Sequence, residues 1–394
     1  MNTVAGIAVL ILSCIGNAEL WVILVNRRHS LRYRHATLRQ IRSLHDFGLL
    51  LFPPFILCLA GLTDGGLLRG GTFSDQRLSV QWILIITMTG VIPFAYSVIR
   101  WQVRSAPTRL LSTSSKVHDA LRSANTAKER AAVTGERIST ISSFPFNQIF
   151  QLEVNRKRIR IGRSPGNPSV RRLLTLAHFS DVHLIGCPGK GFHDFVTDRL
   201  AELQPDAFVF TGDLLDRIVL LDWAVESFRK LASVAPGYFI LGNHDWHLEH
   251  QEIRAAICDT GWQNVADRHS LISLAGASVR IAGTEAPWLG ENPAVPQREE
   301  ANEDVRILLS HSPDQRDYAC SNDFDLMLSG HNHGGQVVLP FFGPVYSPSK
   351  YGVKYSGGVF EHNEMVIHVS RGVAAKDPLR WNCRPEVTLL ELEF

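Results

Sequence analysis

The sequence has little net charge, few cysteines and no internal repeat. Its 394 residues carry 40 Lys and Arg against 38 Asp and Glu, so the formal net charge is only +2. This balance argues against a nucleic-acid partner, because proteins that bind nucleic acid usually carry a basic excess. The six cysteines contain no CxxC pair, which favours reduced packing cysteines over a disulfide framework. They are Cys14, Cys58, Cys187, Cys258, Cys320 and Cys383.

Apolar residues are concentrated in three runs near the N-terminus. Residues 3–25 are almost wholly apolar and are long enough to cross a bilayer core. No Lys or Arg precedes this run and no small-x-small cleavage site follows it, so we interpret it as a span and not as a signal peptide. Residues 47–63 contain a Pro-Pro pair and are either a kinked span or a re-entrant hairpin. With residues 79–99, they predict a membrane region over residues 1–104 with three transmembrane segments.

Arginines are distributed unequally between the loops that join these runs. The first loop, residues 26–46, carries six arginines against one acid, whereas residues 64–80 carry two arginines against two acids. Because basic residues mark the cytoplasmic side, we expect the N-terminus outside and everything after residue 100 in the cytoplasm. This orientation changes if the middle run does not span.

The composition changes again after the third run. Residues 105–140 are rich in Ser, Thr, Ala and basic residues, which predicts a linker that is a mobile or helical tether. Alternating apolar residues over residues 149–161 surround a polar Asn-Arg-Lys triplet and predict a β-hairpin. We therefore place a second domain over residues 141–394.

Short apolar runs in this domain alternate with helix-like segments. This alternation predicts an α/β domain, in which ligands gather at the carboxyl ends of the strands. The apolar runs are residues 173–177, 207–210, 238–241, 305–309 and 326–328, and the helix-like segments include residues 192–203, 224–233 and 249–259.

The third apolar run ends in Gly242-Asn243-His244-Asp245. The glycine allows a sharp turn, and Asn243 offers a neutral oxygen to a metal ion. His244 can donate a proton to an anion, and Asp245 can orient that imidazole as the third member of a triad does. Alone, such a tetrapeptide is more often a polar turn between a strand and a helix.

Metal-ligating residues follow the other four runs as well. A lone histidine is usually structural and a Gly-Asp pair is usually a turn, but five such strand ends in one domain are hard to explain as turns. Carboxylate, imidazole and amide donors without a thiolate suit Mn, Fe or Zn, and there are enough for two divalent ions. The four further elements are Asp181-x-His183, Gly212-Asp213, His311 and His331-x-His333.

The ordered pattern D-x-H, G-D, G-N-H-D, H, G-H-x-H resembles the calcineurin-like metallophosphoesterases over residues 170–394. The resemblance implies an α/β (α+β) fold, a four-layer sandwich of two mixed β-sheets flanked by helices. Here a helical transmembrane region would precede it. The resemblance also implies roles for the motif residues. Asp181, His183 and His333 would bind one metal, Asn243, His311 and His331 the other, Asp213 would bridge them, and His244 with Asp245 would be catalytic without binding metal.

The implied reaction is hydrolysis of a phosphodiester or pyrophosphate by a hydroxide that bridges the two metals. His244 would protonate the leaving oxygen or stabilise the transition state. One alternative is a membrane-tethered module that binds metal without turnover, although the complete ligand set argues against it. Another is a nuclease of the same superfamily, although the domain lacks a basic stripe interleaved with aromatics.

The C-terminal segment is similar to a bacterial branch of YkuE-type and YaeI-type phosphodiesterases that includes a UDP-2,3-diacylglucosamine pyrophosphatase of lipid A synthesis. The similarity lies in residues 340–344, 370–372 and 383–387. Together with the three apolar runs and the distribution of arginines, it leads us to expect a multi-pass protein of the bacterial inner membrane with a cytoplasmic catalytic domain. We also expect a phosphate-ester substrate that is lipid-linked. Phe341 and Phe342 are candidate contacts for its acyl chains, and core packing is their other interpretation.

Overall fold

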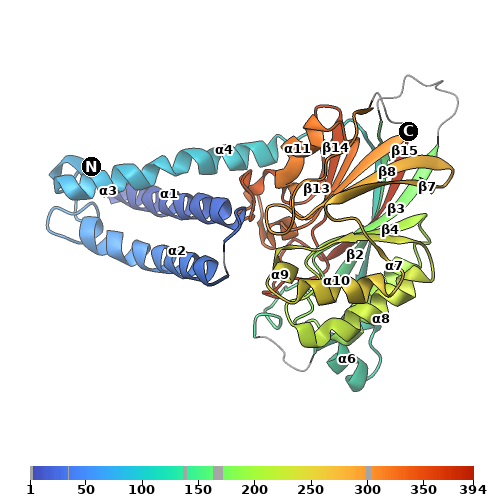
Figure 1. Cartoon of the computed structure of the whole chain (residues 1–394). Helices are drawn as coiled ribbons and strands as arrows, with labels where there is room; N and C mark the ends of the chain where they lie inside the picture. Colours follow the sequence, from blue (N-terminus) through green and yellow to red (C-terminus); the bar gives the residue numbers. More distant parts are fainter. Residues whose placement is uncertain (1–2, 34, 136–139, 163–171, 299–302) are drawn as a thin grey trace. The chain divides into compact units, whose positions relative to one another are not determined.

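A computed structural model of the chain, drawn in Figure 1, describes residues 3–33, 35–135, 140–162, 172–298 and 303–394. The described residues form two compact units. The first contains the residues up to Arg104 together with a later segment, Leu339–Lys354. The second contains the stretches Ser105–Val338 and Tyr355–Phe394.

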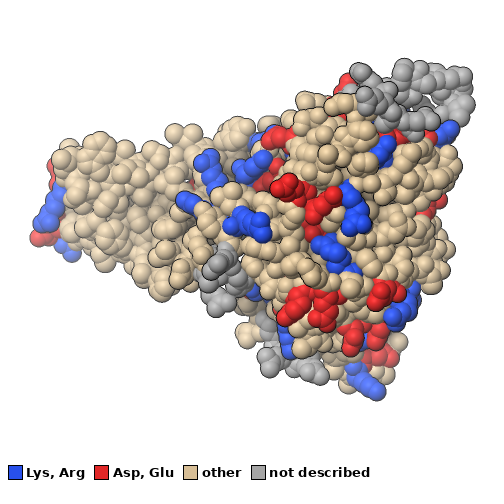
Figure 2. All heavy atoms as spheres, in the orientation of Figure 1, with Lys and Arg blue, Asp and Glu red and all other residues tan. Residues whose placement is uncertain are grey.

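The first unit is built on four helices. Helix α1 packs against the other three, and Figure 1 shows them side by side. Three helical stretches, residues 3–28, 40–61 and 78–102, are long and apolar enough to cross a membrane, as predicted. Figure 2 shows almost no charged side chains on the visible flank of these helices. The helices are α1 (Thr3–His29), α2 (His35–Ile56), α3 (Leu78–Thr89) and α4 (Val91–Gln102).

The second apolar run forms a continuous helix in the structure, not a re-entrant hairpin. Helix α2 contains both Pro53 and Pro54 and continues into a π-helical turn, η1 (Leu57–Gly61). Proline removes a backbone donor from the helix, and a wider turn is a common way to absorb such an irregularity. The 3₁₀ turn η2 (Phe73–Asp75) then precedes α3.

Small residues allow α1 to approach the α3–α4 junction closely. A Cβ atom at Gly16 would collide with the carbonyl of Thr87, and one at Gly90 would collide with the carbonyl of Gly16. The hydroxyl groups of Ser13 and Thr87 also bond to each other. Close contact at small residues is typical of helices that pack within a membrane.

The second unit contains two mixed β-sheets. In spatial order, the first sheet is β1 (Leu110–Asp119), β2 (Gln151–Arg160), β15 (Glu386–Glu393), β3 (Leu173–Phe179), β4 (Ala207–Thr211), β5 (Gly237–Ile240) and β6 (Gln263–Asn264). The second sheet is β13 (Gly358–His362), β14 (Met365–Val369), β10 (Leu326–Ser329), β9 (Val305–Ser310), β8 (Ala277–Thr284) and β7 (Arg268–Leu274). Strands β3 to β6 run parallel, as do β14, β10, β9 and β8.

The two sheets pack face to face, and helices cover the outer face of the first sheet (Figure 1). Leu176 and Val209 of the first sheet share one buried cluster with Ile307 and Leu328 of the second. A second cluster joins the first sheet to the helices that cover it. The fold confirms the predicted pair of mixed sheets with flanking helices.

The helices and short turns are α5 (Ala120–Ser123), α6 (Ala127–Thr134), α7 (Lys190–Ala201), η3 (Ile218–Leu220), α8 (Leu221–Ala232), α9 (Asn243–Trp246), α10 (His250–Cys258), η5 (Pro313–Gln315), α11 (Arg316–Ser321), η6 (His333–Gly335) and η7 (Gly352–Tyr355).

The structure differs from the prediction in residues 105–161. Part of the predicted linker is β1, which pairs with β2 along its whole length. Residues 149–161, predicted as a hairpin, contain one strand, because β1 and β15 pair with its two edges. Asn155 and Lys157, two of the three polar residues taken for its turn, are buried and contact other strands, whereas Arg156 is exposed. Asn155 donates to Glu386 at 2.8 Å, and the Lys157 amine lies 2.9 Å from a ring nitrogen of His368.

Candidate metal centre

All seven predicted metal ligands closely follow strands, either in the loop after the strand or at the first residue of the next short helix. The carboxyl ends of these strands bring side chains from both sheets together, as is usual in α/β folds. Asp181 and His183 follow β3, Asp213 follows β4, Asn243 follows β5, His311 follows β9, and His331 and His333 follow β10.

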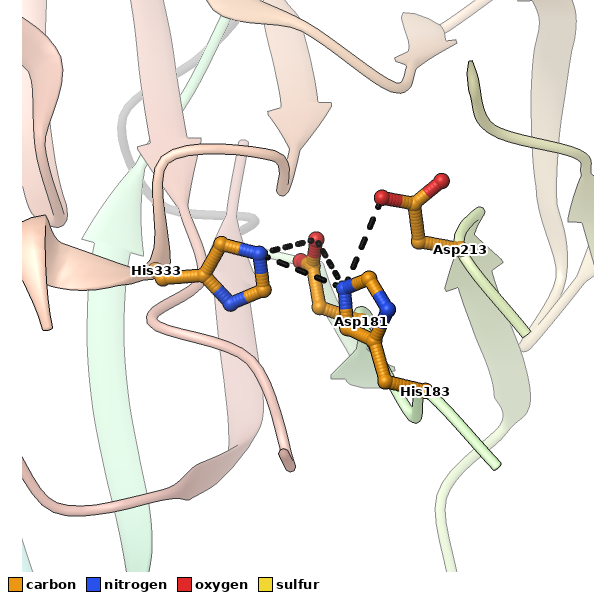
Figure 3. A group of neighbouring side chains, drawn as sticks. All are labelled: Asp181, His183, Asp213 and His333. Atoms are coloured by element: carbon orange, nitrogen blue, oxygen red, sulfur yellow. Dashed lines mark hydrogen bonds and ion pairs between the residues drawn. The ribbon is translucent and has the colours of Figure 1, made fainter. Parts of the chain in front are cut away.

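Four of these side chains form a first group, drawn in Figure 3. The Nε2 atoms of His183 and His333 face each other at 3.2 Å. The Nε2 of His183 lies 3.5 Å from an Asp213 oxygen, and that of His333 lies 3.6 Å from an Asp181 oxygen. Donors that bind one ion at about 2.1 Å lie about 3–3.5 Å apart, so one ion fits between these atoms.

A second group shares Asp213 with the first. The Nε2 of His311 lies 3.2 Å from the Asp213 carboxylate and 3.1 Å from the Asn243 amide oxygen. The Nδ1 of His331 lies 3.2 Å from the same His311 atom. A single carboxylate therefore lies within bonding range of two ion positions.

The imidazole rings of His183, His311 and His333 each also form a hydrogen bond on the side that faces away from the proposed ions. This bond places the ring proton on the outer nitrogen, so the inner nitrogen presents a lone pair. The Nδ1–H of His183 donates to Asp216 at 2.7 Å, and that of His333 donates to the Ala374 carbonyl at 3.2 Å. His311 donates through Nδ1 to the Thr211 carbonyl at 2.7 Å. The inward Nε2 lone pairs of His183 and His333 then repel each other unless a cation lies between them. The donor set thus fits a pair of divalent cations.

The backbone around the two groups is constrained. A Cβ atom at Gly242 would collide with the Asp213 carboxylate, and one at Gly330 would collide with that of Asp181, so glycine is needed at both positions. The backbone is left-handed at five of the predicted ligands, which is a strained arrangement that clusters at functional sites. These are Asp181, His183, Asp213, His331 and His333, with φ between 44° and 70°.

His244 pairs with Asp216, and not with Asp245 as predicted. The Nδ1 of His244 lies 2.6 Å from Asp216 Oδ1. Asp245 instead accepts hydrogen bonds from the backbone N–H groups of Gly242, Leu214 and Leu215. It sits in the first turn of α9, where a carboxylate caps the free N–H groups of the helix start. Asp245 therefore supports the loops that carry Asp213 and Asn243.

Asp216 is one of two positioning residues that the sequence analysis missed. Its two oxygens bond the rings of His183 and His244, so it connects a predicted ligand with the predicted catalytic histidine. The signal was a second carboxylate three residues after Asp213, in the same strand-end loop. It matched no motif and was therefore overlooked.

The charges in this region perturb the pKa values of the histidines. Burial lowers the pKa of His244, but the carboxylates of Asp213 and Asp216 outweigh it and raise the pKa to about 9. Burial also opposes protonation of His311, yet Asp213 raises its pKa to about 9. The concentrated negative charge therefore attracts cations or protons.

Arg380 was also missed, although it holds the loop that carries His333. Its guanidinium is fully buried and donates to the backbone carbonyls of His333 at 2.9 Å and Arg371 at 2.6 Å. It also donates to the Ala374 carbonyl, the acceptor of the His333 ring. Arg380 thus positions both the backbone and the ring of His333.

We predict that Arg380→Lys weakens metal binding by about 10- to 100-fold, the range found for groups that orient metal ligands. A lysine cannot span the three carbonyls that the planar guanidinium reaches. The measurement is metal content and metal-dependent activity across a metal titration. Arg384→Lys is the matched control, because Arg384 lies in the same loop and bonds Gln151. Equal metal affinity in the two variants would contradict the positioning role.

Trp288 and the pair Phe341-Phe342 belong to different compact units. Trp288 is buried, and the centroid of its ring lies 4.9 Å from that of His331 and 5.6 Å from that of His311. Phe341 and Phe342 belong to the other compact unit and are exposed, so they are not core residues. Their role as substrate contacts stays a prediction.

Comparison with known proteins gives one consistent result. The calcineurin-like phosphoesterase family matches residues 174–335. The chain is 32% identical over 209 residues to phosphodiesterase YaeI of Escherichia coli, covering 50% of this chain and 75% of the relative. It is 32% identical over 226 residues to metallophosphoesterase YkuE of Bacillus subtilis, covering 55% and 78%. A bovine transmembrane protein with a metallophosphoesterase domain is 28% identical over 254 residues, covering 57% and 54%.

The chain therefore belongs to the calcineurin-like phosphoesterases, as its motifs predicted. These are hydrolases of phosphate esters that use divalent metal ions. The histidine and aspartate groups of this chain match that requirement.

Proposed function

We propose that this protein is a membrane-anchored phosphoesterase that uses two divalent metal ions and cleaves a phosphodiester or a pyrophosphate. The observation that carries the proposal is the sharing of Asp213 by two adjacent groups of metal-ligating side chains. Two bound cations would supply a nucleophilic water at neutral pH and positive charge for the phosphate oxygens. The mixed nitrogen and oxygen donors suit Mn, Fe or Zn.

The chain's own residues then supply orientation and a proton. Asp216 holds the Nδ1–H of His244, so the Nε2–H of the protonated ring is free to reach a leaving oxygen. The same carboxylate holds His183 in the tautomer whose Nε2 lone pair faces the proposed ion. Asp216 is thus a positioning residue for both a ligand and an acid.

A direct assay tests this proposal. The full-length protein in detergent should hydrolyse bis(p-nitrophenyl) phosphate, lose that activity on strong chelation, and regain it with Mn²⁺, Fe²⁺ or Zn²⁺. Activity that survives complete metal removal would refute it. Metal retained at saturating Mn²⁺ without hydrolysis of the ester would favour the module that binds metal without turnover.

We further propose that the membrane unit places the catalytic unit in the cytoplasm of a bacterial cell. Three antiparallel spans put the two ends of the membrane region on opposite sides, and the arginines follow one side. Arg27 and Arg28 lie in the last turn of α1, Arg100 lies in the last turn of α4, and Arg104 follows α4 by two residues. The α2–α3 loop carries an exposed pair of opposite charges, Arg69 and Asp64, at 3.1 Å. An excess of arginine over acidic residues on one side marks that side as cytoplasmic.

The topology predicts the behaviour of reporter fusions. Alkaline phosphatase fused after Phe394 should be inactive, because it folds only outside the cytoplasm, whereas green fluorescent protein at that site should be fluorescent. Fusions after residue 70, in the α2–α3 loop, should give the opposite result. Phosphatase activity of the C-terminal fusion would reverse the proposed orientation.

The most specific part of the proposal is that the substrate is a lipid-linked molecule such as UDP-2,3-diacylglucosamine. A bilayer anchor offers little advantage for a soluble substrate, and nucleotide-activated lipids are made on the cytoplasmic face. Full-length protein should therefore cleave this lipid more efficiently than bis(p-nitrophenyl) phosphate. If the lipid is not cleaved, or if Phe341→Ala and Phe342→Ala weaken both substrates equally, the lipid proposal fails and the general reaction stands.

A further inference from the structure

Residues 339–354 leave the α/β unit and join the helical unit. This segment begins with a short hairpin formed by β11 (Val338–Leu339) and β12 (Gly343–Pro344). The turn between the two strands contains Phe341 and Phe342. We name residues 338–344 the aromatic hairpin.

The aromatic hairpin packs on one face of α4. The rings of Phe342 and Phe94 are stacked, with centroids 5.9 Å apart. The side chain of Gln102 donates to the Phe341 carbonyl at 2.9 Å. Gly343 lies so close to the Trp101 indole that a Cβ atom would overlap the ring. Phe94 and Trp101 are seven residues apart and therefore share a face of the helix.

A different face of α4 is apolar and exposed. Ile92, Tyr96, Ile99 and Val103 recur at intervals of four, three and four residues and form an exposed stripe along the helix. Ile92, Tyr96 and Ile99 belong to the stretch Leu78–Gln102, which is long and apolar enough to cross a membrane, and Val103 follows it directly. Helix α4 thus offers one face to lipid and another to the aromatic hairpin.

The length of this stretch sets the depth of the hairpin. Its 25 residues span about 38 Å, which exceeds the bilayer core of about 30 Å by about 8 Å. Phe94 lies about 12 Å before the C-terminal end of the helix. Even if the whole excess of about 8 Å lies at this end, Phe94 is still inside the bilayer core. Phe342, stacked on Phe94, is therefore within or at the edge of the hydrocarbon region.

The exposure of the hairpin tip fits this depth. Phe341 is 82% exposed and Phe342 is 46% exposed among the described residues. Phe341 also adopts φ +68°, a left-handed conformation that a bulky residue rarely holds. Exposed aromatics are unfavourable in water but typical of the membrane interface. A basic residue beside an aromatic ring is also typical of the membrane interface. The Arg104 guanidinium lies 3.6 Å from the Trp101 ring centroid.

We propose that the aromatic hairpin is embedded at the boundary between headgroups and acyl chains of the bilayer that α4 crosses, with Phe341 and Phe342 in contact with lipid. The proposal rests on the membrane placement proposed above. Pairing of β11 with β12 satisfies backbone groups that lipid would leave without partners.

This contact ties the proposed metal-ligand loop to the bilayer. The aromatic hairpin begins five residues after His333, and the N–H of Val338 donates to Trp381 of the α/β unit. The segment returns at Tyr355, whose carbonyl accepts from the Asn332 side chain at 2.8 Å. Asn332 stands between His331 and His333. Both ends of the segment are thus bonded at or near this loop, which gives the catalytic unit a second anchor besides the chain after α4.

Photo-crosslinking tests the proposal without any need for catalysis. p-Benzoylphenylalanine replaces Phe341, Phe342, Tyr96 or Leu271, one at a time, in full-length protein reconstituted in phosphatidylethanolamine and phosphatidylglycerol nanodiscs. Tyr96 is 63% exposed in the lipid-facing stripe, and Leu271 is 50% exposed on β7 of the α/β unit. After illumination, mass spectrometry should find lipid adducts at 341 and 342 in yields comparable with those at 96. Position 271 should give none.

Each outcome decides the question. Adducts at 96 without adducts at 341 and 342 would overturn the embedded hairpin while leaving the membrane anchor intact. No adduct at 96 would overturn both. Protein-to-protein crosslinks at 341 in place of lipid adducts would assign this surface to a second protein chain and equally overturn the proposal. The probe retains an aromatic ring at each phenylalanine, so the stacking on Phe94 is preserved.

Discussion

Asp213→Asn should lower kcat/KM by at least about 10³-fold, the upper range for loss of one electrostatic partner in an active site. The Asp213 carboxylate lies within 3.5 Å of both His183 Nε2 and His311 Nε2, so it faces both groups of proposed ligands. Asparagine is nearly isosteric but presents one NH₂ group and no charge, so it cannot serve two cations. Metal analysis by mass spectrometry should show fewer than two ions per chain.

Asp206→Asn is the matched control for this experiment. Asp206 lies just before β4, whereas Asp213 lies just after it, so the two are at opposite ends of one strand. Asp206 accepts hydrogen bonds from the N–H and hydroxyl of Thr175 at 2.7 Å and contacts no proposed ligand in the described structure. This variant should keep its metal and its rate. Full metal content and activity in Asp213→Asn would rule out a bridging role.

The sequence predicted that the candidate ligands follow strands, because these positions depend on local structure. Each ligand follows a buried strand, and parallel strands bring their carboxyl ends to one edge of a sheet. All five apolar runs after residue 170 are strands in the structure, and the three helix-like segments are α7, α8 and α10. To predict that these side chains lie close together, one then needs only the order of the strands in the sheets. The resemblance to the family implied that order.

Long-range pairing could not be predicted in the same way. Strand β15, from the C-terminus, lies between β2 and β3 in the interior of the first sheet. Glu391 and Glu393 interrupt the apolar residues of this strand, so it does not form a continuous apolar run. Its partners also come from more than 200 residues earlier in the chain. No local pattern carries that information.

Single histidines were equally ambiguous. His178 and His183 flank Asp181 in one short stretch, yet only His183 faces the proposed metal positions. His178 is buried between the sheets, where its ring nitrogens bond His368 at 2.8 Å and Thr211 at 2.9 Å. Burial lowers its pKa to about 3, so it stays neutral. The direction of a side chain, not its type, separates the structural imidazole from the ligand.

His244→Asn should lower kcat by about 10²- to 10⁴-fold, the usual contribution of a general acid, while metal content stays unchanged. The ring of His244 is held by Asp216 and, among the described residues, donates to no proposed ligand. The loss should be smaller for a p-nitrophenyl ester than for an alkyl ester, because p-nitrophenolate leaves without a proton. His247→Asn, three residues further on, is the control. An equal loss with both leaving groups would argue against proton donation.

The pH profile gives an independent test of the same role. Burial alone would lower the pKa of His244, but Asp213 and Asp216 raise it to about 9, so the ring is protonated and able to donate at neutral pH. Hydrolysis of alkyl esters should decline as the pH rises and this proton is lost. Cations bound at the adjacent groups oppose the rise in pKa, so the decline should begin at or below pH 9. Asp216→Asn removes one of the two charges and should move the decline to lower pH, whereas an unchanged profile would mean that His244 is not the acid.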